Sequence, residues 1–108
     1  MARAIRSGAA DRGILFCGTG MGVAIVANKF KGVRAAVVES ELAAAKCRII
    51  NDANVLALGG MFVSEFVALL AVDRFLELAH TEGTDPELAA FLRRADAEIK
   101  KLEAENFR

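Results

Sequence analysis

The 108-residue sequence has no tryptophan and no tyrosine, and it contains only one histidine, one proline and two cysteines. Seven phenylalanines are the only aromatic residues, so the side-chain platforms on which single-stranded nucleic acid stacks are missing. The single histidine and the two distant cysteines, Cys17 and Cys47, lack the spacing of metal ligands. We therefore expect neither a metal nor any other cofactor.

An excess of charge of either sign is also absent. Fourteen Lys and Arg residues balance fourteen Asp and Glu residues, so the chain lacks the net positive charge that is typical of a general nucleic-acid-binding protein. No apolar run approaches the roughly 20 residues of a membrane-spanning helix, and the first residues lack the apolar core of a secretory signal. Free thiols fit a reducing compartment. The sequence thus predicts a cytoplasmic protein that binds neither nucleic acid nor membrane.

The composition that remains is that of a small folded domain. Hydrophobic residues make up 55% and charged residues 26% of the chain, a globular balance that argues against disorder. A short chain with such a high apolar fraction is expected to cover part of its surface with another subunit. A homodimer or homotetramer is the expected assembly.

Apolar runs and helical patterns alternate along residues 1–80, after an opening that is typical of the end of a helix. Three runs that end at glycine or polar residues predict strands at 13–17, 34–38 and 54–58. Helices are predicted at about 23–29, 40–50 and 63–79, with Ser40 as an N-cap. This alternation predicts an α/β domain, a Rossmann-like three-layer α/β/α arrangement around a parallel sheet of about three strands.

The tail, residues 81–108, has a different character. Asp85 and Pro86 form a helix start, with Asp85 as N-cap and the proline at the first helical position. Apolar residues then recur at helical spacing at Leu88, Phe91, Leu92, Ala95, Ile99 and Leu102. We expect an amphipathic helix that packs on its own domain or on a partner subunit. Its solvated face should carry Arg93 and Arg94 and a weak pair between Glu98 and Lys101.

The densest chemical signal is the segment Cys17-Gly18-Thr19-Gly20-Met21-Gly22, where a strand gives way to a helix. Ligands of α/β sheets bind at such junctions. Alternating glycines let backbone N–H groups converge on a phosphate or on an oxyanion that develops during a reaction. Cys17 stands at the edge of this loop, where those groups would favour its thiolate. A thiolate there suits proton abstraction next to a carbonyl or nucleophilic attack, although a buried cysteine before a tight turn explains the pattern equally well.

Other polar positions carry weaker signals. A dinucleotide site is disfavoured, because Val23 stands where the third glycine of Gly-x-Gly-x-x-Gly belongs. The segment Asn51-Asp52-Ala53-Asn54 precedes the third strand and is typical of a turn. Cys47 is expected in the core, and His80 in a solvated loop.

Several segments resemble the ribose-5-phosphate isomerase B and galactose-6-phosphate isomerase family: 13–22, 27–29, 32–35 and 51–59, within a match from about residue 4 to 78. The resemblance implies aldose–ketose isomerisation of a phosphorylated sugar, such as ribose 5-phosphate, through an enediolate. It implies that Cys17 is the base that moves the proton between C1 and C2 and that Thr19 assists at the sugar hydroxyls. The implied substrate-binding residues are Gly18, Gly20, Met21 and Gly22, whose amides would hold the enediolate oxygen, and Asn51, supplied by the neighbouring subunit of a dimer.

The sequence departs from the family pattern in three places. The strand with a Gly-Asp-His-Ala-Gly-like segment that usually opens the family has no counterpart here. Ile50 stands where the family has a histidine associated with ring opening, and Met61 stands where an arginine commonly follows. A four-carbon sugar 4-phosphate cannot close a furanose ring, so Ile50 predicts a tetrose phosphate as a candidate substrate. The alternative is a catalytically incompetent phosphosugar-binding or regulatory chain, or one subunit of a hetero-oligomeric isomerase.

Overall fold

The fold is known from a computed structural model that describes residues 1–107. Its elements, in chain order, are α1 (Ala2–Ser7), β1 (Gly13–Cys17), α2 (Met21–Ala27), β2 (Ala35–Val37), α3 (Glu41–Ile49), β3 (Val55–Gly59), α4 (Glu65–Glu77) and α5 (Pro86–Asn106). The predicted alternation of strands and helices is confirmed.

The three strands form one parallel sheet in the order β1-β3-β2. All five residues of the central strand β3 are buried, as its continuous apolar sequence predicts. Gly13 lies opposite Val55 and Cys17 lies opposite Gly59, so β1 and β3 end at the same edge of the sheet. In a parallel sheet the loops that follow the strands lie at the carboxyl edge. This register therefore places the loop after β1 next to the loop after β3.

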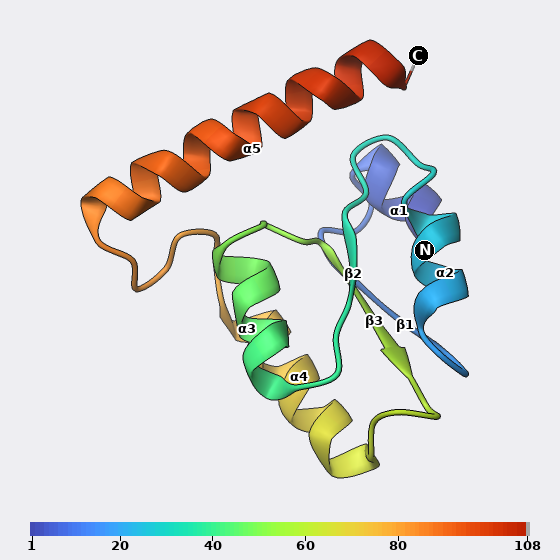
Figure 1. Ribbon diagram of the computed structural model, residues 1–108. Helices are drawn as coiled ribbons and strands as arrows, with labels where there is room; N and C mark the ends of the chain where they lie inside the picture. The colour runs from blue at the N-terminus through green and yellow to red at the C-terminus, as the bar shows by residue number, and fades with distance from the viewer. Residues whose placement is uncertain (108) are drawn as a thin grey trace.

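Helices cover both faces of the sheet (Figure 1). On one face, Leu56 and Leu58 pack with Phe75 in a core that also includes residues of α3 and α4. On the other face, Val55 packs in a smaller core with Ile5 of α1 and residues of α2. The alternation of side chains along β3 thus serves two helical layers, which confirms the three-layer α/β/α arrangement.

Side-chain caps begin three of the helices, and two of them, Ser40 and Asp85, are the predicted caps. Ser40 accepts a hydrogen bond from the Ala43 N–H at 3.0 Å, and Ser64 accepts one from the Val67 N–H at 3.2 Å. Asp85 accepts one from the Leu88 N–H at 2.8 Å. The helix after β1 differs from expectation: it begins at Met21 rather than about residue 23, directly after a glycine in the left-handed conformation.

The tail helix α5 lies apart from the helices that cover the sheet (Figure 1). Only Ala89 and Leu92 of this helix are buried. Four other members of its apolar stripe are exposed: Leu88, Phe91, Ile99 and Leu102. The stripe is therefore largely uncovered by the chain's own domain. Among residues 1–107 the expected Glu98–Lys101 pair is not formed, and the ion pair within this part of α5 joins Lys100 to Asp96 at 2.9 Å. No helix in that range is long and apolar enough to cross a membrane.

Candidate functional site

Cys17 occupies the end of β1, where the strand turns into the glycine-rich loop. Its thiol is half-buried, and its Sγ accepts a hydrogen bond from the Gly20 N–H at 3.0 Å. The backbone N–H groups of Val23 and Thr19 also favour its anionic form. The sulfur atom is thus surrounded by donors from the turn that follows it.

These donors stabilise the thiolate of Cys17. The backbone N–H of Val23 makes the largest contribution to lowering the pKa of Cys17, and partial desolvation opposes it. Bonds from the Thr19 and Gly20 amides and from the Thr19 hydroxyl lower it further, so the net pKa lies below that of an ordinary thiol. The lowered pKa increases the fraction of Cys17 that is thiolate, the form that can act as a base.

The glycine loop is pressed against the end of β3. Gly20 has a φ of 76°, and a Cβ on it would lie 2.9 Å from the Leu58 carbonyl carbon. A Cβ on Gly59 would lie only 2.4 Å from the Thr19 carbonyl carbon. Glycine is therefore required at both positions: Gly20 for its left-handed backbone and Gly59 for the close approach. This packing fixes the loop relative to the sheet.

Two backbone hydrogen bonds extend the contact between the two strand ends. The Gly60 N–H donates to the Cys17 carbonyl at 2.9 Å, and the Met61 N–H donates to the Gly18 carbonyl at 2.8 Å. The Met21 N–H donates to the Thr19 hydroxyl oxygen at 3.2 Å. The predicted group Cys17 to Gly22 is thus brought together. Several of its amides, however, donate to Cys17 and Thr19 and are not available to a ligand.

Asn51 lies at the other end of the sheet. It sits in the turn between α3 and β3, at the amino end of β3, whereas Cys17 ends β1 at the carboxyl edge. The five residues of β1 span about 16 Å at roughly 3.3 Å per residue. One chain therefore does not bring Cys17 and Asn51 to the same small molecule.

Arginine side chains hold the turn that contains Asn51. Arg48 is buried, and its Nη1 donates to the Asp52 carboxylate at 2.9 Å and to the Ala53 carbonyl at 2.6 Å. Arg34 Nη1 donates to the Asn51 carbonyl at 3.2 Å. The turn predicted at these positions is confirmed, with Asp52 in the left-handed region at a φ of 52°. Both arginines that hold it were missed. Arg34 is 17 residues from Asn51. The spacing of Arg48 and Asp52, four residues apart, was a local signal that could have found Arg48.

His80 differs from the expectation of a solvated residue. It is half-buried, and its Nε2 lies 3.3 Å from the Ile50 carbonyl oxygen. The reason is that α4 runs back to the amino end of the sheet, so the loop after it meets the Asn51 turn. Arg93 and Arg94 are exposed, as predicted for a solvated face.

Cys47 is a core residue, as predicted. Its Sγ donates to the Ala44 carbonyl at 3.1 Å, and burial raises the pKa of the Cys47 thiol. It is thus the inert counterpart of Cys17. Within the part of the chain that the structure describes, no three His, Cys, Asp or Glu side chains gather as metal ligands do.

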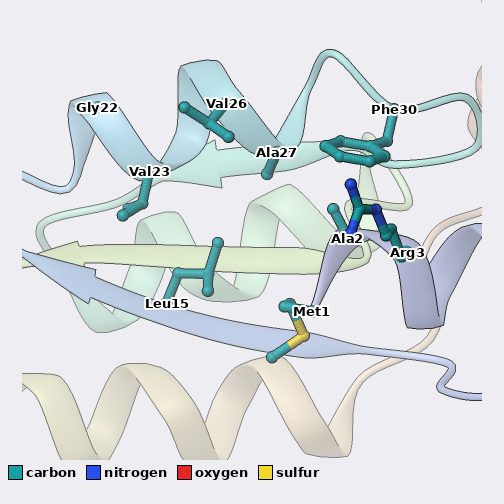
Figure 2. Close-up of a pocket in the computed structure, with 9 residues that line it drawn as sticks. All are labelled: Met1, Ala2, Arg3, Leu15, Gly22, Val23, Val26, Ala27 and Phe30. Carbon is teal, nitrogen blue, oxygen red and sulfur yellow. The ribbon is translucent and has the colours of Figure 1, made fainter.

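An apolar groove of about 420 Å³ runs beside β1, at the edge of the sheet. Figure 2 shows Met1, Leu15, Val26 and Phe30 gathered between α1, α2 and the sheet. Sequence patterns gave no sign of it, because its lining comes from separate elements. Apart from Arg3 its lining side chains are apolar, so it is suited to apolar side chains rather than to a sugar.

Comparison with known proteins identifies the family of this fold and loop. Residues 1–92 match the family model described as Ribose/Galactose Isomerase. The chain therefore belongs to the ribose/galactose isomerase family of sugar-phosphate isomerases. The resemblance seen in residues 13–22 and 51–59 is confirmed.

Three curated relatives show how far the similarity extends. The chain is 45% identical over 107 residues to the 4-deoxy-4-sulfo-D-erythrose isomerase of a Clostridium species, covering 99% of this chain and 67% of that protein. It is 43% identical over 83 residues to ribose-5-phosphate isomerase B of Escherichia coli, covering 77% and 56%. It is 42% identical over 83 residues to the D-erythrulose-4-phosphate isomerase of Pectobacterium atrosepticum, covering 77% and 54%. The chain thus spans about half to two thirds of the length of these relatives.

Solved structures agree with the sequence comparison. Ribose-5-phosphate isomerase B from Mycoplasma genitalium, solved with bound ribulose-5-phosphate, superimposes with a TM-score of 0.84 at 39% identity. The match covers 97% of this chain and 65% of that one. The fold therefore extends over the whole described chain, α5 included.

Proposed function

We propose that this chain catalyses aldose–ketose isomerisation of a small sugar with a terminal anionic group, through an enediolate, with Cys17 as the base. The observation that carries the proposal is the environment of the Cys17 sulfur, which sits at the carboxyl edge of the sheet among backbone N–H groups. Membership in a family of sugar-phosphate isomerases supplies the reaction class.

In this mechanism the Cys17 thiolate removes the proton from C2 of the open-chain aldose. The electron pair moves through the new C1–C2 double bond to the C1 oxygen, which becomes the enediolate oxygen. Amides of the glycine loop that do not bond to Cys17 or Thr19, those of Gly18 and Gly22, stabilise that oxygen. The Cys17 thiol then returns its proton to C1 while the proton on O2 moves to O1, assisted by the Thr19 hydroxyl, and the ketose is released.

The preferred substrate is proposed to have four carbons. Ile50, exposed beside Asn51, supplies no acid for opening a ring. A tetrose whose C4 carries a phosphate ester or a sulfonate has no C4 hydroxyl with which to close a furanose ring, so it needs no such acid. The similarity to the sulfo-erythrose isomerase covers 99% of the chain, whereas the similarities to the two phosphate isomerases cover 77% of it each.

The complete site is proposed to form between two copies of the chain. Cys17 and Asn51 lie at opposite ends of one sheet, so Asn51 reaches the substrate of a neighbouring subunit in a homodimer. Large apolar residues are exposed around the Cys17 edge: Phe16, Met21, Met61, Phe62 and Phe66. Covering them is a reason for a second subunit to pack there.

Proton NMR in D2O tests the proposal. Erythrose 4-phosphate, 4-deoxy-4-sulfoerythrose and ribose 5-phosphate are added separately to the folded chain. We expect conversion of a four-carbon aldose to its ketose with deuterium at C1, at least tenfold faster than conversion of ribose 5-phosphate. Faster turnover of ribose 5-phosphate would refute the four-carbon preference, and no turnover by a well-folded chain would refute the enzymatic assignment.

A second candidate is a chain that becomes active only with another polypeptide. The apolar groove beside β1 favours it, because an edge strand next to uncovered apolar side chains is a place where a further element can pack (Figure 2). In that case the purified chain alone would not turn over any of the three sugars. A phosphosugar-binding protein without activity would still shift its amide signals on addition of the sugar.

A further inference from the structure

A partly buried ion pair attaches the tail helix to the domain. Asp96 of α5 pairs with Arg34, which directly precedes β2, and their side chains are only 13% and 19% exposed. The apolar residues of the same helix are far more open, for example Leu102 at 57%. Asp96 is thus more buried than the apolar residues Ile99 and Leu102 that follow it, so this contact helps to place the C-terminal half of α5.

Arg34 also controls the turn that contains Asn51. Its Nη1 donates both to the Asp96 carboxylate and, at 3.2 Å, to the Asn51 carbonyl. Its backbone N–H donates to the Asn54 side-chain oxygen at 2.8 Å, and its carbonyl accepts from the N–H groups of Asn54 and Val55 at 3.0 and 3.1 Å. One residue therefore fixes both ends of the turn.

We propose that Arg34 and Asp96 are positioning residues that hold Asn51 in its substrate-binding place, which makes the tail helix part of the site. The inference rests on the proposed function, in which Asn51 contacts the sugar. Asp96 acts through Arg34, since among the described contacts it bonds only Arg34 and Lys100.

The surroundings explain why Arg34 depends on Asp96. A cavity of about 620 Å³ lies between α5 and the start of β2, and Arg34, Asn51, Ile99 and Leu102 are among its lining residues. Without the carboxylate, the guanidinium group has space to turn away from the Asn51 carbonyl and become hydrated. The Asn51 turn would then lose the donor that fixes its first residue.

Lys100 provides a matched control. Its Nζ contacts the other oxygen of Asp96 at 2.9 Å, but the lysine side chain is 66% exposed. It touches neither Arg34 nor Asn51 in the described contacts. Lys100→Ala therefore removes an ion pair from the same carboxylate without removing the link to the turn.

The kinetic test is a cycle of variants. We expect Asp96→Asn to raise KM about tenfold with kcat changed less than threefold, and Lys100→Ala to change both less than twofold. Combined with Asn51→Ala, Asp96→Asn should cost nothing more in kcat/KM, because its target is gone. Equal losses in both backgrounds would show that Asp96 acts by general destabilisation, and the inference would be wrong.

A second variant guards against poor folding of Asp96→Asn. Arg34→Lys keeps the cation that pairs with Asp96, but a lysine lacks the planar fork that reaches two acceptors at once. We expect an unchanged melting temperature and a raised KM. A wild-type KM in this variant would contradict the role of Arg34.

A measurement without substrate separates this inference from the proposed function. Backbone amide NMR signals and hydrogen exchange at Asn51 and Asp52 should change in Asp96→Asn and stay as in the wild type in Lys100→Ala. Unchanged signals in a folded Asp96→Asn protein would refute the positioning role even if the enzyme is active. Changed signals with no turnover of any sugar would support the link and refute the proposed function instead.

Discussion

The two ends of the sheet are held in place by different means. At the carboxyl edge, the loop after Cys17 is fixed by backbone contacts that only glycine permits, at Gly20 and Gly59. At the amino edge, the Asn51 turn is held by the side chains of Arg34 and Arg48. Close backbone packing leaves the first region little freedom to adjust, whereas long charged side chains can rearrange. We therefore expect substitutions at the first edge to affect turnover and those at the second to affect stability and substrate affinity.

The largest expected effect comes from the sulfur of Cys17. Cys17→Ser should lower kcat about 10³-fold, because a hydroxyl is a far poorer base at neutral pH and a positioned base contributes roughly 10²- to 10⁴-fold. Cys47→Ala, in the core, is the control and should keep kcat within a few-fold. Turnover is followed by NMR, and wild-type turnover in the serine variant would remove Cys17 from the mechanism.

Gly59→Ala tests the backbone packing of the carboxyl edge. A Cβ 2.4 Å from the Thr19 carbonyl carbon must displace the loop, so we expect a loss of about 1–3 kcal/mol in unfolding free energy and a drop of tenfold or more in kcat. Gly60→Ala is the neighbouring control, since its Cβ would meet only the Cys17 carbonyl oxygen at 4.0 Å. Urea unfolding and turnover are measured for both variants. Equal unfolding free energies and equal kcat values in the two variants would mean that the loop moves to accommodate the added Cβ at little cost.

Arg48→Met tests the amino edge. It removes the donor to the Ala53 carbonyl and to the Leu78 carbonyl, which leaves buried acceptors unpaired and should cost about 1–3 kcal/mol of unfolding free energy. The expected change in kcat is small, because the Cys17 loop is at the far end of the sheet. Lys46→Met, exposed on the same helix, is the control. A kcat that falls as far as in Gly59→Ala would abolish the distinction between the two edges.

The smallest effect concerns pH. The donors around the sulfur lower the pKa of Cys17, and the thiolate is the active form, so kcat/KM should fall as pH drops through that lowered pKa and level off above it. Thr19→Val removes one of the donors, so the rise should move to higher pH. Iodoacetamide alkylation of the thiolate as a function of pH reports the same shift without substrate. An unmoved profile would mean that the backbone N–H groups alone set the pKa.

Much of the fold was predictable because local patterns determine it. Apolar runs ended by Gly18 and Gly59 marked β1 and β3, and Ser40 and Asp85 marked helix starts through short-range bonds. The junction at Cys17 was visible for the same reason, since its donors lie within six residues of it. Such interactions are encoded in adjacent residues, so the sequence contains both partners in one pattern.

The rest was decided by tertiary structure. Asp96 meets Arg34 across 62 residues, and the Cβ space of Gly59 is filled by Thr19 from a different loop. His80 lies in the predicted loop but is half-buried rather than fully solvated, because α4 returns the chain to the turn that contains Asn51. The sequence by itself thus determined the elements, their caps and the donors at Cys17. Only the tertiary structure decided which distant residues meet. A charge can be buried, or a Cβ excluded, only where a residue from another part of the chain packs against that position.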